Sequence, residues 1–141
     1  MPAPLSSSEQ AHLHELGIRR FNAGEFFAAH EAWEELWQTL PEGPHRQSYQ
    51  VLIQMAVALE LYRRSIPAGV LRTCLRYQRR LAALSAPMST GIDLLALSAA
   101  MDQAMAEILA TDTVPARGSI SIQTIRAPRI VPVYNPYQLK S

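Results

Sequence analysis

The segment from His45 to Arg64 carries apolar side chains on nearly every side of a helical wheel. One side presents Leu52, Met55, Leu59 and Tyr62, and much of the opposite side presents Ile53, Val57 and Leu61. A helix that is apolar nearly all round is stable when other elements surround it. The sequence therefore predicts a helical protein with this segment in the middle of a bundle.

Four further helices are predicted around this segment. Ser6 and Glu9 have the Ser-x-x-Glu spacing of a capping box, which predicts a helix over residues 8–22. The other predicted helices cover residues 25–40, 67–84 and 92–110, and glycine and proline residues separate them. Because the connections are short, neighbouring helices should run antiparallel. We therefore predict an all-α fold, an antiparallel bundle of about five helices within residues 1–112.

Residues 113–141 have a different character. Prolines at positions 115, 128, 132 and 136 exclude a helix, and residues 119–125 alternate as a strand does. The segment also carries too many apolar side chains for a solvated tail, namely Ile120, Ile122, Ile125, Ile130, Val131 and Tyr134. We predict an extended, Pro-rich C-terminal arm that docks on the bundle or on a neighbouring subunit. In the second case the protein would be a homo-oligomer.

The helix predicted over residues 25–40 holds the one concentrated polar feature of the chain. His30 falls within an aromatic stripe that includes Trp33 and Trp37, and Glu34 lies at its edge one turn later. Glu31 falls on the outward side of the same wheel. Helical periodicity thus predicts that His30 and Glu34 point together toward the interior.

Two interpretations of this pair remain open. In the structural one, His30 and Glu34 pair in the core, because an unpaired buried polar group costs about 1–3 kcal/mol. Further partners would then come from Gln50, Gln54 or Glu60 on the central helix, or from Asn22.

In the functional interpretation the pair belongs to a site. The site is either a metal-free pocket in which His30 acts as acid or base, or a metal site that includes Glu34. The order His-Glu-x-x-Glu lacks the second histidine of the metalloprotease helix, so a metal would need a third ligand, best supplied by Glu60.

A longer pattern contains the same residues. Its first part is Phe21-Asn22-x-Gly24-x-Phe26-Phe27-x-x-His30-Glu31-x-x-Glu34-x-x-Trp37, and its second part is Gln50-x-x-Ile53-Gln54-x-Ala56-Val57-Ala58. Over about residues 16–70 this pattern resembles the domain of unknown function 309 family of small prokaryotic helical proteins. The resemblance implies a compact helical bundle in a bacterial or archaeal cytosol, and it implies no activity or cofactor. The positions that it marks are Asn22, Gly24, His30, Glu31, Glu34, Trp37 and Gln54.

The chain departs from the family pattern at three places. Val51 stands where the family has glycine, and Ser65-Ile66-Pro67 replaces a turn similar to Gly-Asn-Pro. Glu60 stands where a histidine is expected, so either it substitutes as a carboxylate or the site is altered. The inclusion of Glu31 conflicts with its outward position. Either it reaches Arg19 or Arg20, or it lines the mouth of a cleft.

A basic stripe follows on the helix predicted over residues 67–84. It consists of Arg72, Arg76, Arg79 and Arg80. Clustered arginines can bind nucleic acid, but a solvated face or pairing with the acidic helix 25–40 is the more common outcome. The formal net charge of only +1 gives no overall electrostatic attraction for nucleic acid, so nucleic acid is not the expected partner.

The remaining features bear on location. Cys74 is the single cysteine, residues 1–8 lack the features of a signal peptide, and the longest apolar stretch is shorter than the roughly 20 residues of a membrane span. These features predict a cytoplasmic protein with no membrane span. His12, His14 and His45 fall on predicted surfaces or turns, and we assign them no role.

Two functions follow from the sequence. The first is a ligand-binding or protein-interaction domain with a polar cluster between helices 25–40 and 45–64. The second is a small enzyme that uses His30 and Glu34 as an acid/base pair or as metal ligands, with Gln54 or Glu60. The sequence contains no nucleophile–base motif, phosphate-binding loop or complete metal signature, and this favours the first.

Overall fold

The computed structural model describes residues 4–138, which form six α-helices, one 3-10 turn and no strand. The helices are α1 (Ser7–Asn22), α2 (Phe26–Thr39), α3 (Pro44–Arg63), α4 (Pro67–Ala82), α5 (Leu94–Ala104) and α6 (Ala106–Leu109). The all-α fold predicted from the sequence is confirmed.

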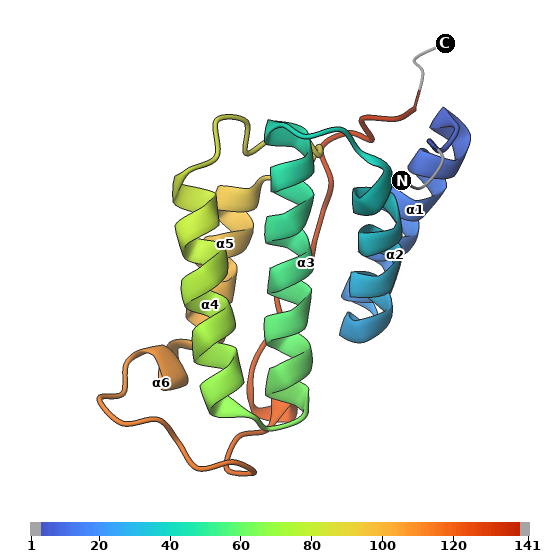
Figure 1. Ribbon diagram of the computed structural model, residues 1–141. Helices are drawn as coiled ribbons and strands as arrows, with labels where there is room; N and C mark the ends of the chain where they lie inside the picture. Colours follow the sequence, from blue (N-terminus) through green and yellow to red (C-terminus); the bar gives the residue numbers. More distant parts are fainter. Residues whose placement is uncertain (1–3, 139–141) are drawn as a thin grey trace.

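Helix α3 lies at the centre, with α2 on one side and α4 on the other, while α1 packs on α2 and α5 packs behind α4 (Figure 1). One side of α3 is fully buried, as predicted, and includes Leu52, Met55, Leu59 and Tyr62. The opposite apolar side is only partly covered, because Ile53, Val57 and Leu61 are half-buried. The predicted central position of this helix is confirmed, and its cover is incomplete on the side that faces α2.

The helix ends follow the local sequence. The Ser6 hydroxyl accepts from the Glu9 backbone N–H and the Glu9 carboxylate accepts from the Ser6 N–H, both at 3.1 Å, so the predicted capping box is present. The fifth predicted helix is instead broken at Met105 into α5 and α6. Met105 is fully buried with its sulfur 3.4 Å from that of Cys74, and the break lets both Met105 and Ile108 pack in the core.

The C-terminal arm docks on its own bundle and passes behind α3 (Figure 1). The Asn22 amide of α1 donates to the carbonyl of Ile130 at 2.8 Å and accepts from its N–H at 2.7 Å. The Val133 N–H donates to the carbonyl of Gly91 at 2.7 Å, in the loop before α5. Where the sequence alternates like a strand, the arm forms the 3-10 turn Ile122–Thr124. Its backbone is therefore held mainly by side chains and loops.

Among the helices of residues 4–138, none combines the length and the apolar character needed to cross a membrane.

Candidate functional site

His30, Glu34 and Trp37 lie along one side of α2, about one turn apart, and face α3. The His30 Nε2 is 2.6 Å from the Glu34 Oε2, and the two side chains are 21% and 41% exposed. The predicted pairing is therefore present, but at the edge of a groove. Both side chains face α3 and are partly buried, whereas Trp33 of the same stripe is fully buried at 0% exposure and packs on Gly17 of α1.

We call this feature the α2–α3 groove. It is formed by Phe27, His30, Glu34 and Trp37 of α2, by Gln50, Ile53, Gln54, Val57, Glu60 and Leu61 of α3, and by Arg64 directly after α3. A hollow of about 260 Å³ has apolar walls that include Phe27, Val57 and Leu61, with His30 at its border. A second hollow of about 200 Å³ lies between Trp37 and Gln54. The His30–Glu34 pair joins them, because His30 lines the first hollow and Glu34 lines the second.

Three polar atoms of the groove are buried without a hydrogen-bond partner: His30 Nδ1, Trp37 Nε1 and Gln54 Oε1. When His30 Nε2–H donates to the Glu34 carboxylate, the neutral ring leaves Nδ1 as an acceptor. The indole N–H of Trp37 can only donate, and the amide oxygen of Gln54 can only accept. Each such group costs about 1–3 kcal/mol unless something pairs with it. One donor and two acceptors at the groove are therefore left unpaired.

Arg46 of α3 covers the outer face of Trp37. Its guanidinium carbon lies 3.9 Å from the centre of the indole ring, and its Nε donates to the Trp37 carbonyl at 3.2 Å. Glu42 accepts from the same guanidinium at 2.7 Å. Glu42 is almost fully exposed, so its ion pair with Arg46 contributes little to stability.

Glu60 does not join His30 and Glu34 as a ligand. Its carboxylate accepts from Arg63 Nε at 2.8 Å and from Arg64 Nε at 2.7 Å. Hydrogen bonds from Arg63, aided by Arg64, lower the pKa of Glu60. Within residues 4–138, no group of three His, Cys, Asp or Glu side chains is placed to hold a metal ion, so the geometry of these residues does not support the metal alternative that used Glu60 as the third ligand.

Two other residues of the family pattern lie away from the groove. Asn22, one of the alternative partners considered for His30, instead binds the arm through Ile130. Glu31 is exposed and forms no ion pair within the described part of the chain. Arg20, one of its expected partners, instead donates to the carbonyl of Ala28 at 3.2 Å.

The structure contains a second polar cluster that was not predicted from the sequence, because His14 and His45 were expected on surfaces or turns. His14 Nδ1 lies 2.7 Å from the Tyr49 hydroxyl, and the Tyr49 ring stacks on Tyr137 of the arm with ring centres 6.3 Å apart. The Tyr137 hydroxyl lies 2.5 Å from His45 Nε2, and His45 Nδ1 lies 3.1 Å from the Ser89 hydroxyl. The cluster joins α1, α3, the loop before α5 and the arm.

The cluster is strongly desolvated. Burial, with a further contribution from the charge of His45, lowers the pKa of His14 to about 4. Burial also lowers the pKa of His45 and raises the pKa of Tyr137 to about 12. One sequence signal could have revealed His14, because it shares a helical stripe with Gly17, Ile18 and Phe21, all buried. No local signal reveals Tyr137 as a partner.

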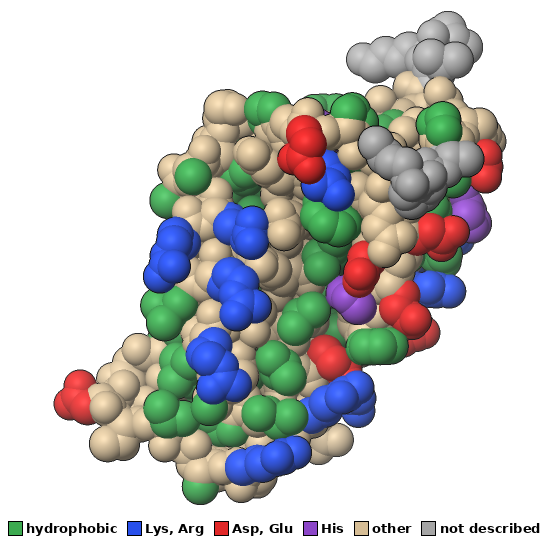
Figure 2. All heavy atoms as spheres, viewed as in Figure 1, with side chains coloured by type: hydrophobic (Ala, Val, Ile, Leu, Met, Phe, Trp, Pro, Cys, Tyr) green, Lys and Arg blue, Asp and Glu red, His purple; other side chains and the backbone are tan. Residues whose placement is uncertain are grey.

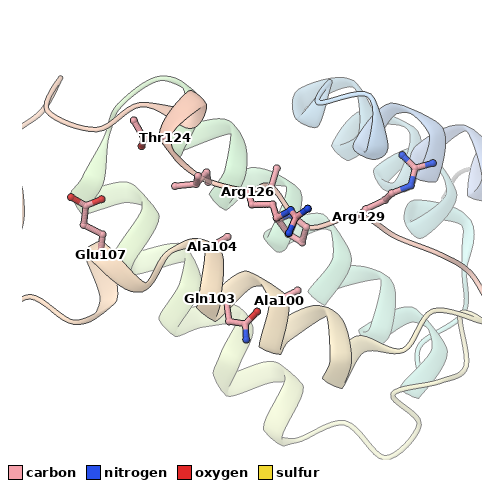
Figure 3. A pocket seen from close by; sticks show the side chains of 10 residues that line it. Ala100, Gln103, Ala104, Glu107, Thr124, Arg126 and Arg129 are labelled. Carbon is pink, nitrogen blue, oxygen red and sulfur yellow. The ribbon is translucent and has the colours of Figure 1, made fainter.

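A larger hollow, about 470 Å³, lies between α5 and the arm. Figure 3 shows Gln103 and Glu107 on its helical side and Thr124 and Arg126 on the side of the arm. None of the unpartnered buried side-chain atoms in residues 4–138 belongs to a residue that lines it. The α2–α3 groove is therefore the better candidate for a binding site.

Comparison with known families bears on the same groove. Residues 14–73 match the family model described as Domain of unknown function (DUF309). The resemblance seen in the sequence is confirmed over this segment, which runs from α1 into α4 and contains both walls of the groove. The arm and α5 lie outside the DUF309 segment. Searches of curated proteins and of solved structures gave no match.

Proposed function

We propose that the protein is a binding domain whose α2–α3 groove holds a small organic molecule with an apolar body and an amide-like polar end. The observation that carries this proposal is the set of three buried, unpartnered polar atoms along the groove, with His30 at the apolar hollow and Trp37 and Gln54 at the second hollow. Binding sites commonly combine apolar walls with a few convergent polar groups. The partly covered side of α3, with Ile53, Val57 and Leu61, supplies the apolar walls.

The unpartnered atoms define the chemistry of the ligand. Trp37 Nε1–H requires an acceptor, whereas Gln54 Oε1 and His30 Nδ1 require donors. A primary carboxamide carries one acceptor and two N–H donors in a fixed plane, and an attached aromatic ring would fill the hollow beside Phe27 and Leu61. Because all three atoms are buried, binding requires the side chains that cover them to move aside.

The proposal is tested with benzamide as the probe, measured by NMR chemical-shift titration, with toluene as the probe that lacks the amide. We expect benzamide to shift the signals of the groove and toluene to bind more weakly. Gln54→Leu and Trp37→Phe each remove one hydrogen-bonding atom, and each should weaken benzamide binding about tenfold. Glu31→Gln, on the outer side of α2, is the matched control and should bind as the parent does. If both amide-atom variants bind like the parent, the proposal fails.

A second function is supported by the contact between His30 and Glu34. A carboxylate bound to one imidazole nitrogen fixes the tautomer and leaves the other nitrogen as a proton acceptor. His30 could then serve as the general base of a small enzyme. General-base catalysis contributes about 100-fold or more, so hydrolysis of an activated aryl ester should fall by that factor in His30→Ala. Equal rates in parent and variant would leave only the binding function.

We also infer a cytoplasmic location in a prokaryotic cell and self-association through the arm. Cys74, the one cysteine, is buried and unpaired, as in proteins of reducing compartments. Val131 and Val133 of the arm are 78% and 69% exposed, and a second copy would cover them. Sedimentation velocity should therefore detect a dimer that is lost in Val131→Ser/Val133→Ser. A parent protein that is monomeric at high concentration would contradict self-association.

A further inference from the structure

Four arginines lie along the exposed side of α4, beside the α2–α3 groove, whose Gln50 accepts a hydrogen bond from Arg80. We call this surface the α4 basic face, and it consists of Arg72, Arg76, Arg79 and Arg80. Figure 2 shows basic side chains gathered over α4 and acidic side chains gathered on the other side of the same view, over α2. The net charge of +1 is therefore unevenly distributed, with a local basic region over α4.

The arginines of this face are not neutralised within the protein. The four ion pairs found among residues 4–138 involve His30, Arg46, Arg63 and Arg64, and none involves the α4 basic face. Arg80 donates only to the neutral Gln50 Oε1, at 3.0 Å. No acidic residue occurs from position 61 to position 92. Ion pairs between these arginines and the acidic helix α2 were one of the outcomes expected from the sequence, and none forms within residues 4–138.

We propose that the α4 basic face binds the phosphate backbone of double-stranded nucleic acid without reading its sequence. At a rise of about 1.5 Å per residue, Arg72, Arg76 and Arg79 are spread over roughly 10 Å of the helix. Arginines carried on long side chains over this length can engage several phosphates of one duplex, and their planar guanidinium groups match phosphate oxygens in pairs. Contacts to phosphates alone carry no sequence information.

A membrane surface fits the same charges less well. A helix that lies in a lipid interface needs a broad exposed apolar side beside its basic residues. On α4, Leu75 is the large apolar side chain exposed to solvent, whereas Val70, Tyr77 and Leu81 are buried against the bundle. The face can therefore bind phosphates but offers little to insert among lipid chains.

The test measures fluorescence anisotropy of a labelled 24-base-pair DNA duplex with the full-length chain over a range of salt concentrations. Four phosphate contacts predict a slope of about −3.6 for log affinity against log salt, or roughly 150-fold weaker binding after a fourfold rise in salt. In the variant Arg72→Gln/Arg76→Gln/Arg79→Gln, one contact remains and the slope should fall to about −0.9.

A matched control separates this surface from net charge. Arg117→Gln/Arg126→Gln/Arg129→Gln removes the same charge from exposed positions of the arm and should bind as the parent does. The proposal is overturned if the parent does not bind the duplex at low salt, or if the control loses as much affinity as the α4 variant. Binding to phosphatidylserine vesicles without binding to the duplex would also overturn it, in favour of a membrane surface.

Discussion

The buried His14 predicts a specific loss of stability as the pH falls. His14 is fully buried, its Nδ1 contacts the Tyr49 hydroxyl at 2.7 Å, and its Nε2 has no partner. Burial lowers the pKa of His14 from 6.5 to about 4. Between these two values the unfolded chain therefore binds a proton that the folded chain does not. Stability from this residue is complete above the unfolded pKa and is lost as the pH falls toward the folded pKa.

The size of the effect follows from the two pKa values. Between about pH 7 and about pH 5, linkage gives a loss of roughly 2 kcal/mol in the free energy of unfolding from His14 alone. His45 adds to the loss in the same direction, because burial lowers its pKa as well. Glu60 does not contribute in this window, because its pKa is lowered from 4.5 and its carboxylate stays ionised.

The assay is urea denaturation followed by circular dichroism at several pH values between 7 and 5. The variant His14→Gln keeps a polar side chain beside Tyr49 but cannot titrate, so its stability should fall by about 2 kcal/mol less than that of the parent over this range. His12→Gln removes an exposed histidine of the same helix and should behave as the parent does. If the parent and His14→Gln lose equal stability over this pH range, then burial does not lower the pKa of His14 as proposed.

Two further predictions concern packing. Asn22→Ala removes both hydrogen bonds to Ile130 and should cost roughly 1–3 kcal/mol; amide exchange at Ile130 should become faster, and unchanged exchange would contradict the role of Asn22 in holding the arm. Gly17→Ala places a methyl group where the Trp33 indole lies, so we expect the free energy of unfolding to fall by about 3 kcal/mol. Thermal unfolding measures this loss, and a variant as stable as the parent would contradict the close approach of Trp33 to Gly17.

The sequence identified the helices because their signals are local. The capping box at Ser6, the prolines at the starts of α3 and α4, and the 3.6-residue spacing of apolar side chains act within a few turns of chain. The break at Met105 was missed because it depends on packing against Cys74, which lies 31 positions away.

The candidate site was predictable only in part. The contact between His30 and Glu34 followed from their spacing of four residues on one helix. Their position at a groove did not, because it depends on how far α2 covers the apolar side of α3. Glu60 was proposed as a partner of this pair because it is a carboxylate on the neighbouring helix. In the structure its carboxylate instead accepts hydrogen bonds from Arg63 and Arg64.

By itself, the sequence determined a helical bundle with an extended arm and a polar pair on its second helix, since periodicity and capping are properties of neighbouring residues. Only the tertiary structure decided that His14 meets Tyr49, that Asn22 holds Ile130, and that α3 is left partly open beside α2. These contacts join residues from distant parts of the chain, and the packing of whole helices selects them.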